Sequence, residues 1–500
     1  MTAQDQTPRT RRPERRLRGG ALIAMAVSLV IAAGCGSAAT PAATTSATAT
    51  PTAAAVTSVS ASPATTTGTT TGATTGATNG GAPGGQGGGG ASTALASTAT
   101  GVYNQSGGSA EKTGATYTAT NADQSGVLVS GGGTLTLTNV TVKTSGNTSA
   151  GDNSSFAGLN AGVLATGDST ITINGGTIDT TGSGANGAFA SGSGSSVTLK
   201  DVKITAAGDG GHGVMATGGG TVTVTGGSMT TSGPHGATLA TDRGGGTVTA
   251  TGGTYTTSGI DSPAIYSTGT ITVTGGTYTA IGSEAAVIEG ANSITLTDAT
   301  LTSSMADKWG VMIFQSFSGD AQGSKGTFTM TGGTLSITGA NSPLFYVNNS
   351  TGIITLKGVT VSETSGVLVK AAAGKWGTAG SNGGTVILTA DDEKLTGDVV
   401  ADNISSVTLT LRNSTTLTGS INADNAAKSA ALTLDGTSTW NVTADSHLAS
   451  LMGALISGTT ITNITGNGHT VTYDAGNAAN SSLGGKTYAL SGGGTLTPAS

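Results

Sequence analysis

The sequence has few aromatic residues, few charged residues and one cysteine, and each shortage excludes something. Aromatic residues make up 3% of the 500 residues and charged residues 9%. Because so few large side chains cannot fill several spherical cores, the composition favours one long, thin core built from Val, Ile, Leu and Ala. With Cys35 as the only cysteine, no disulfide can form within the chain.

Cationic residues are also scarce beyond the N-terminus. Six of the eight arginines precede residue 19: Arg9, Arg11, Arg12, Arg15, Arg16 and Arg18. From Cys35 onward the chain holds 14 Lys and Arg against 24 Asp and Glu. Because nucleic-acid binding needs clustered cations, this acidic region predicts no nucleic-acid partner.

The N-terminus has the three-part order of a signal peptide. An Arg-rich stretch over 9–18 precedes an apolar run over 21–33 (ALIAMAVSLVIAA), and small residues then lead to Cys35. The apolar run is too short to span a bilayer comfortably as a permanent helix. The segment therefore predicts export from the cytoplasm.

Small residues before a cysteine resemble the lipobox of bacterial lipoproteins, although Ala32 stands where that family usually has Leu. The resemblance implies that residues 1–34 are a signal peptide and that Cys35 carries a lipid, which holds the protein on the outer side of the cell membrane. The alternative is an ordinary secretory signal followed by an incidental cysteine. Residues 35–100, rich in Ala, Thr, Ser, Gly and Pro, cannot bury a core and are predicted to form a disordered linker.

From about residue 127 the chain repeats one three-part unit. A short apolar run, here called the landmark strand, recurs at spacings of 22 to 36 residues, as in Gly162-Val-Leu-Ala and Gly213-Val-Met-Ala. An alternating segment such as Thr221-Val-Thr-Val follows, then two turn residues, often Gly-Gly, and a third short strand such as Thr277-Tyr-Thr. Three short strands per period of about 25 residues predict one coil of a parallel β-helix. A β-sandwich does not explain this recurrence.

This pattern resembles the right-handed parallel β-helix proteins, which include pectate-lyase-like enzymes, autotransporter passenger domains and adhesin-like surface proteins. The resemblance implies an all-β, single-stranded right-handed parallel β-helix over roughly residues 115–470. The phrase Ser438-Thr-Trp-Asn-Val-Thr, followed by Ser446-His-Leu-Ala-Ser-Leu, is similar to the last coils of autotransporter passengers. We expect an N-terminal cap over 101–126, the β-helix over 127–395, and terminal coils with a C-terminal cap over 396–500.

In a regular solenoid, chemistry is expected where residues break the repeat. One candidate ligand-binding edge follows the landmark strands in successive coils and holds Asp242, Arg243, Glu289, Gln315 and Asp320. Coils stack about 4.8 Å apart, which places these residues along one line. An arginine flanked by acids suits sugar acids or a carboxylated polysaccharide.

The same edge allows other interpretations. Arg243 can act as the base of a pectate-lyase-like polysaccharide lyase, and two of the acids can serve a glycoside hydrolase. Calcium binding by the acids is possible in principle, although no dense ladder of aspartates supports it. The plainest alternative is that these are turn residues and corner salt bridges.

A second candidate edge precedes the landmark strands. The position two residues before the first apolar residue holds, in four coils, His212, His235, Glu284 and Trp309. The spacing makes His212 and His235 neighbours in successive coils. Adjacent histidines can bind a metal, but a solvated stack is the commoner outcome, so the sequence predicts no metal and no cofactor.

The landmark strands are apolar at both alternating positions, so one set of side chains must point outward and be covered. The cover is a lateral loop, the N-terminal segment or a partner, and we expect a loop. One predicted set is Leu164, Phe189, Met215, Ile265, Val287, Met312 and Phe345, and the opposite set is Val163, Ala190, Val214, Tyr266, Ile288 and Ile313.

A ladder of outward threonines is predicted on a second sheet. Its members are Thr172, Thr198, Thr223, Thr249, Thr272, Thr295, Thr329 and Thr355. Such arrays on a β-helix resemble ice-binding faces, although threonine is also a favourable residue on any exposed strand. The sequence thus predicts a lipid-anchored surface protein that is adhesin-like or glycan-binding, with a polysaccharide or surface partner. The alternatives are a carbohydrate-active lyase or hydrolase, and ice binding.

Overall fold

The computed structural model describes residues 99–318 and 320–499. The predicted signal peptide, Cys35 and nearly all of the predicted linker lie outside the described residues. Within the described ranges, no helix is both long enough and apolar enough to cross a membrane.

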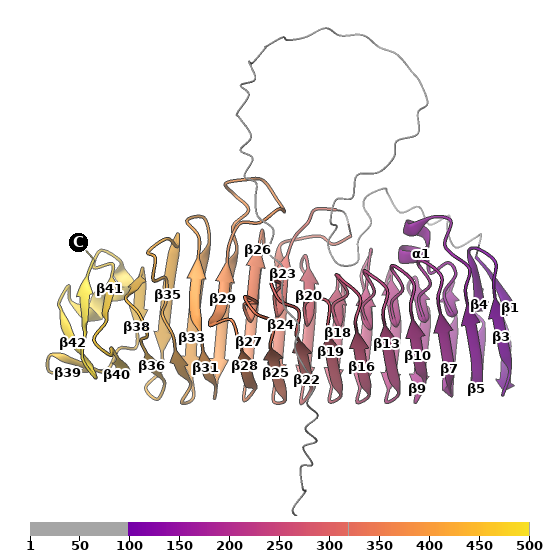
Figure 1. Ribbon diagram of the computed structural model, residues 1–500, viewed down its shortest axis with the longest axis horizontal. Coiled ribbons are helices and arrows are strands. Elements are labelled where there is room, and N and C mark those ends of the chain that lie inside the picture. The colour runs from indigo at the N-terminus through magenta and orange to yellow at the C-terminus, as the bar shows by residue number, and fades with distance from the viewer. Residues whose placement is uncertain (1–98, 319, 500) are drawn as a thin grey trace, which may run out of the picture. The chain divides into compact units, whose positions relative to one another are not determined.

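The described chain is a right-handed parallel β-helix of about 16 turns, with about 25 residues per turn and 3% helix. This confirms the predicted fold class. A typical coil contributes one strand to each of three faces, and strands of successive coils pair side by side in parallel (Figure 1). Residues 101–126, for which the sequence predicts a cap, carry strands that pair in the same way as those of later coils.

The first face, sheet A, is a 12-stranded parallel sheet that contains the landmark strands. In spatial order its strands are β1 (Thr100–Ser106), β4 (Gln124–Ser130), β6 (Val163–Thr166), β8 (Ala188–Ser191), β11 (Val214–Thr217), β14 (Leu239–Thr241), β17 (Ile265–Ser267), β20 (Ala286–Glu289), β23 (Val311–Phe314), β26 (Phe345–Asn348), β29 (Val367–Ala371) and β32 (Asp398–Ala401).

The second and third faces form one 22-stranded sheet, because β5 (Thr134–Thr144) and β7 (Thr170–Thr180) run across both. The second face further contains β2 (Ser109–Thr113), β9 (Ser196–Lys200), β12 (Gly220–Thr225), β15 (Gly246–Thr251), β18 (Thr270–Thr274), β21 (Ser293–Thr297), β24 (Lys325–Thr331), β27 (Thr351–Lys357), β30 (Thr385–Asp391), β33 (Ser406–Arg412), β35 (Ser429–Leu434) and β38 (Ser450–Met452). The third face contains β3 (Thr116–Ala119), β10 (Lys203–Ala206), β13 (Ser228–Thr231), β16 (Thr254–Thr257), β19 (Thr277–Ala280), β22 (Thr300–Ser303), β25 (Thr334–Ile337) and β28 (Thr360–Glu363).

A nine-stranded sheet closes the C-terminal end. It contains β31 (Lys394–Thr396), β34 (Thr416–Thr418), β36 (Thr439–Asn441), β37 (Ser446–Leu448), β39 (Ile456–Ser457), β40 (Thr460–Thr465), β41 (Thr470–Tyr473), β42 (Tyr488–Ser491) and β43 (Thr495–Pro498). The pairs β39–β40 and β42–β43 are antiparallel, and the short 3-10 helix η2 (Ala478–Leu483) precedes β42. Trp440 of the terminal phrase is fully buried, and its Nε1 donates to the Gly419 carbonyl at 2.9 Å.

Alternation of apolar and polar residues explains each coil. In β12, Val222 and Val224 are 0% and 3% exposed, while Thr223 between them faces outward. β-branched residues suit this pleated, half-buried geometry. Val222 pairs in register with Val197 of the preceding coil and Val248 of the next, so each inward side chain stacks on its equivalents. One coil cannot complete this core, and stability therefore comes from stacking.

A column of glycines lets coils approach closely at the corner that leads into sheet A. Gly182, Gly208, Gly233 and Gly259 occupy this corner in successive coils. A Cβ on Gly208 would lie 1.9 Å from the carbonyl oxygen of Gly182. Any larger residue therefore requires the two backbones to move apart.

The outer face of sheet A forms a second apolar cluster, but three residues of the two predicted sets, Ile265, Tyr266 and Phe345, lie on the side opposite to that of their set. Ile265 and Phe345 lie in the internal core, whereas their neighbours Tyr266 and Tyr346 point outward. The register gives the reason: Ile265 pairs with Leu239, the first residue of its strand. In the coils that begin at Pro263 and at Pro343, one apolar residue, Ala264 or Leu344, precedes the strand, whereas in the coil of Gly213 the strand begins directly after the glycine.

Lateral segments cover the outer cluster, as predicted for a loop. The segment that holds α1 (Gly151–Ala157), between β5 and β6, packs over Leu164 and Phe189, and Thr217 Oγ1 donates to the Phe156 carbonyl at 2.8 Å. Further covers are loop 315–324, which follows β23, and loop 372–384, which follows β29. The Trp376 ring of the latter lies 5.7 Å from that of Phe314. Figure 1 shows α1 and both loops projecting from the same side of the coils.

Candidate functional site

The first candidate edge forms a buried cluster where strands of sheet A end. Asp242 and Arg243 follow β14, Glu289 ends β20, Gln315 follows β23, and Asp320 lies in loop 315–324. The four residues other than Arg243 are 1% to 3% exposed, and the Arg243 side chain is 12% exposed. The five residues therefore lie together at the edge of sheet A, but their charged groups are buried beneath the lateral segments.

Arg243 links two lateral segments to the coils. Its Nη2 donates to Asp320 Oδ1 at 2.6 Å, and its guanidinium lies 3.8 Å from the centre of the Phe156 ring. Its backbone N–H donates to Asp242 Oδ1 at 2.7 Å. One cation thus contacts both loop 315–324 and the α1 segment.

Two serines and a tyrosine complete the cluster. The Tyr266 hydroxyl donates to Glu289 Oε2 at 2.8 Å, and the Ser316 hydroxyl donates to Glu289 Oε1. Ser318 Oγ donates to Asp320 Oδ2 at 2.8 Å. Sequence reasoning missed these three residues, although the Ser-Phe-Ser segment directly after Gln315 marks a break in the repeat.

The cluster holds more acid than base, and burial shifts its protonation. Burial, with the nearby charges of Asp320 and Glu289, raises the pKa of Asp242 well above its ordinary value. Burial also raises the pKa of Glu289, against the hydrogen bonds from Ser316 and Tyr266 that lower it. The cluster therefore holds three carboxyls and one guanidinium, and the raised pKa values of Asp242 and Glu289 favour their neutral forms, which reduces the excess negative charge.

We expect the covered edge to lose stability as the pH rises. A folded-state pKa above the unfolded value stabilises the fold fully below the unfolded pKa, near 4, and this stabilisation is lost as the pH rises through the folded value. The melting temperature of the full-length chain should therefore fall as the pH rises above about 4, and Asp242→Asn should flatten that fall. The same change at the exposed Asp424 should leave it intact. A pH-independent melting temperature in the unsubstituted protein would contradict this prediction.

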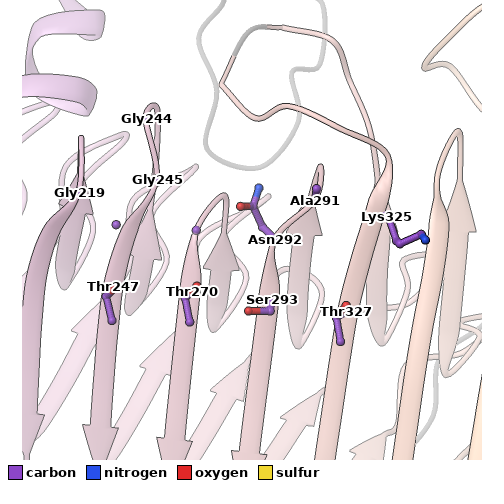
Figure 2. A pocket seen from close by; sticks show the side chains of 12 residues that line it. Gly219, Gly244, Gly245, Thr247, Thr270, Ala291, Asn292, Ser293, Lys325 and Thr327 are labelled. Carbon is purple, nitrogen blue, oxygen red and sulfur yellow. The ribbon is translucent and has the colours of Figure 1, made fainter.

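A groove of about 330 Å³ lies beside the cluster (Figure 2). It follows the corner between sheet A and the second face across successive coils. It is lined by Gly219, Gly244, Gly245, Gly246, Thr247, Gly269, Thr270, Ala291, Asn292, Ser293, Lys325 and Thr327. Two lining positions adjoin the cluster, because Gly244 follows Arg243 and the Asn292 side chain donates to the Glu289 carbonyl at 2.6 Å.

The second candidate edge does not bring its two histidines into register. Val214 pairs with Leu239, which places Ala237 rather than His235 beside His212, and the Ala237 N–H donates to His212 Nδ1 at 2.9 Å. His212 and His235 are therefore offset from the predicted register, because the landmark strand of that coil starts two residues later than expected. Burial lowers the pKa of His212 to about 4, which keeps the ring neutral.

The other members of this edge have separate partners. His235 Nδ1 lies 2.8 Å from Asp209 Oδ1 at a partly exposed position. Glu284 is 1% exposed, and Trp309 stacks on Tyr346. No group of three or more His, Cys, Asp or Glu residues in the described ranges is arranged to hold a metal ion.

The threonine ladder of the second face is in register throughout. Each predicted member pairs with the next, and the column extends to Thr136 at one end and through Thr389 and Thr410 to Thr433 at the other. From β12 to β24, Thr or Ser also stands two residues to either side of the column. The face is a regular array of hydroxyls, and ice binding stays a prediction.

No family model, no curated protein and no solved structure matches this chain. The parallel β-helix is therefore established from the chain's own geometry, and its function must be argued from the same source.

Proposed function

We propose that the protein is an extracytoplasmic, lipid-anchored β-helix that binds an extended glycan along the groove. The groove across successive coils carries this proposal. Its walls offer hydroxyls at Thr247, Thr270, Ser293 and Thr327 and an amide at Asn292. Such neutral donors and acceptors match the hydroxyls of a sugar chain.

The charge of the groove favours an anionic glycan. Lys325 lines it, and no carboxylate is among its lining residues. A lysine attracts the carboxylates of a uronic-acid polymer as a point charge. The adhesin-like alternative of a protein partner is less favoured, because the lining lacks the aromatic anchors typical of protein interfaces.

In this proposal the first candidate edge supports the groove and does not contact the ligand. Arg243, Glu289 and Asp320 hold the turns and the loop that border it. Their burial also favours binding over cleavage, because a lyase base or a hydrolase acid must reach the sugar. The groove itself supplies no carboxyl group for a hydrolase, and Lys325 is the one titratable residue of its lining.

We expect Lys325→Ala to weaken capture of the full-length chain by polygalacturonate beads about tenfold, the scale of one charge-assisted contact. Capture is measured as the bound fraction against bead concentration. The matched control is Lys357→Ala, which removes an exposed lysine at the far end of the neighbouring strand β27 and should leave capture unchanged. The groove proposal fails if the unsubstituted chain is not captured, or if both variants behave alike.

The proposed anchor rests on Cys35, which lies outside the described residues. We expect Cys35→Ala to move the protein from the membrane fraction to the medium, since the lipid has no other thiol to join. Ser37→Ala, two residues away, should stay in the membrane fraction. Fractionation and immunoblotting measure both. Equal distribution of the two variants would rule out the lipid anchor.

A further inference from the structure

An aromatic pair lies at the edge where the chain enters sheet A. Trp309 precedes β23, and its ring stacks on that of Tyr346 with centroids 4.3 Å apart and planes at 8°. Tyr346 is 5% exposed, whereas Trp309 is partly exposed. Tyr346 therefore backs one side of the indole while the tryptophan still reaches solvent. In a chain with three tryptophans, such an arrangement stands out.

A lysine between two acids adjoins this pair. Lys308 Nζ pairs with Asp261 Oδ1, and it lies 4.0 Å from Glu284 Oε1. The Lys308 and Asp261 side chains are 23% and 21% exposed, so both can meet a ligand. Glu284 is 1% exposed, and its Oε1 accepts no hydrogen bond. A buried carboxylate oxygen without a hydrogen-bond donor is unusual, and here the Lys308 ammonium above it supplies the compensating charge.

The segment that carries Lys308 and Trp309 is fixed to the next coil. The Lys308 N–H donates to Ser342 Oγ at 3.2 Å, and the Gly310 N–H donates to the Pro343 carbonyl at 2.9 Å. These bonds hold the backbone on both sides of Trp309. The indole and the ion pair are therefore presented in a set arrangement, which lowers the entropy lost on binding.

The chemistry of this surface restricts its ligand. Lys308 disfavours a cation and Asp261 disfavours an anion. A wholly apolar ligand would displace water from the Lys308–Asp261 ion pair without replacing the hydrogen bonds that the water makes. A neutral ligand with one flat apolar face and a hydroxylated rim satisfies the indole and both charged groups. A pyranose ring with equatorial substituents has this form, because its axial C–H bonds make the flat face.

We propose that Trp309, Lys308 and Asp261 form a binding site for a pyranose unit of a neutral, β-linked glycan, with the buried Glu284 holding Lys308 in place. The ring packs on the indole, and its hydroxyls bond to Lys308 and Asp261. This proposal rests on the proposed function only in taking a glycan as the ligand. The two sites are separate, because this one precedes the strands of sheet A whereas the groove follows them.

Isothermal titration of the full-length chain with cellohexaose and with chitohexaose tests the site. We expect one of them to bind, Trp309→Ala to weaken binding at least tenfold, and Trp309→Phe to retain part of it. Trp376→Ala is the matched control, because Trp376 lies in loop 372–384 near Phe314, and it should bind as the unsubstituted chain does. Circular dichroism checks that each variant keeps its β-rich fold.

The outcomes separate this site from the groove. Absence of binding by both hexasaccharides, or unchanged binding by Trp309→Ala, overturns the site. Lys325→Ala should leave hexasaccharide binding intact. If polygalacturonate capture fails while Trp309-dependent binding is present, the groove proposal falls and this site stands. Capture that depends on Lys325, with no effect of Trp309→Ala, gives the reverse result.

Discussion

Replacing Arg243 with alanine should lower the free energy of unfolding by about 3–5 kcal/mol, the usual cost of breaking a buried ion pair from one side. The variant leaves Asp320, 3% exposed, without its cation. It also removes the guanidinium from the Phe156 ring, so the α1 segment and loop 315–324 both lose a contact. Urea denaturation followed by circular dichroism measures the loss, and hydrogen exchange should place the largest deprotection in loop 315–324.

The chain supplies its own control, because Arg412 is the other arginine beyond the N-terminal region and its side chain is exposed. Arg412→Ala should change stability by less than about 0.5 kcal/mol. Adding Asp320→Asn to Arg243→Ala should restore part of the lost free energy of unfolding, since it removes the buried carboxylate that has lost its partner. Equal effects of the two arginine substitutions would mean that the ion pair does not hold the cover.

Gly208→Ala should destabilise the protein by about 3 kcal/mol, the upper range for overpacking a tight site. The added Cβ would lie 1.9 Å from the Gly182 carbonyl oxygen and 2.5 Å from its carbon. Both obstacles are backbone, so no side chain can turn aside to relieve them. The two coils must separate, and the hydrogen bonds between them lengthen. Thermal unfolding of the full-length chain measures the effect.

Gly436 is the matched control, because nothing lies within 4 Å of the position that its Cβ would take. Gly436→Ala should be neutral or slightly stabilising, since it reduces the freedom of the unfolded chain. A drop in melting temperature as large as that of Gly208→Ala would show that loss of glycine, and not the collision, causes the effect.

The periodic part of the fold was predictable because one rule generates it. Alternation within a strand and a recurring turn suffice to place Val222 inward and Thr223 outward in every equivalent coil. The predicted register was wrong in the coils where this rule allows more than one start for the strand. Ala237-Thr238-Leu239 and Ala264-Ile265 offer two possible starts for the strand, and only the hydrogen bonds between coils decide between them.

The buried cluster around Arg243 was predictable in membership and not in burial. Arg243 is conspicuous because arginine is otherwise almost absent beyond residue 18, and Asp242, Glu289 and Asp320 follow from the period. Their burial depends on the lateral segments, which lie outside the repeat. The periodicity of the sequence does not predict the path of these segments. The signal available was length: the two largest landmark spacings, 36 and 33 residues, contain α1 and loop 315–324. Tyr266 and Ser316 join the cluster only because loop 315–324 covers the edge of sheet A, so the sequence could not assign them to it.

The bonds that cross several coils change how the stack should respond to mechanical load. In a simple solenoid each coil touches only its neighbours, so a pulled molecule peels one coil at a time from an end. Here the Arg243–Asp320 pair joins segments 77 residues apart, and the Thr217–Phe156 bond joins segments 61 residues apart. These two interactions link coils that are not direct neighbours. Under tension, the section between β6 and β24 should yield as one block, at a higher force than the coils on either side.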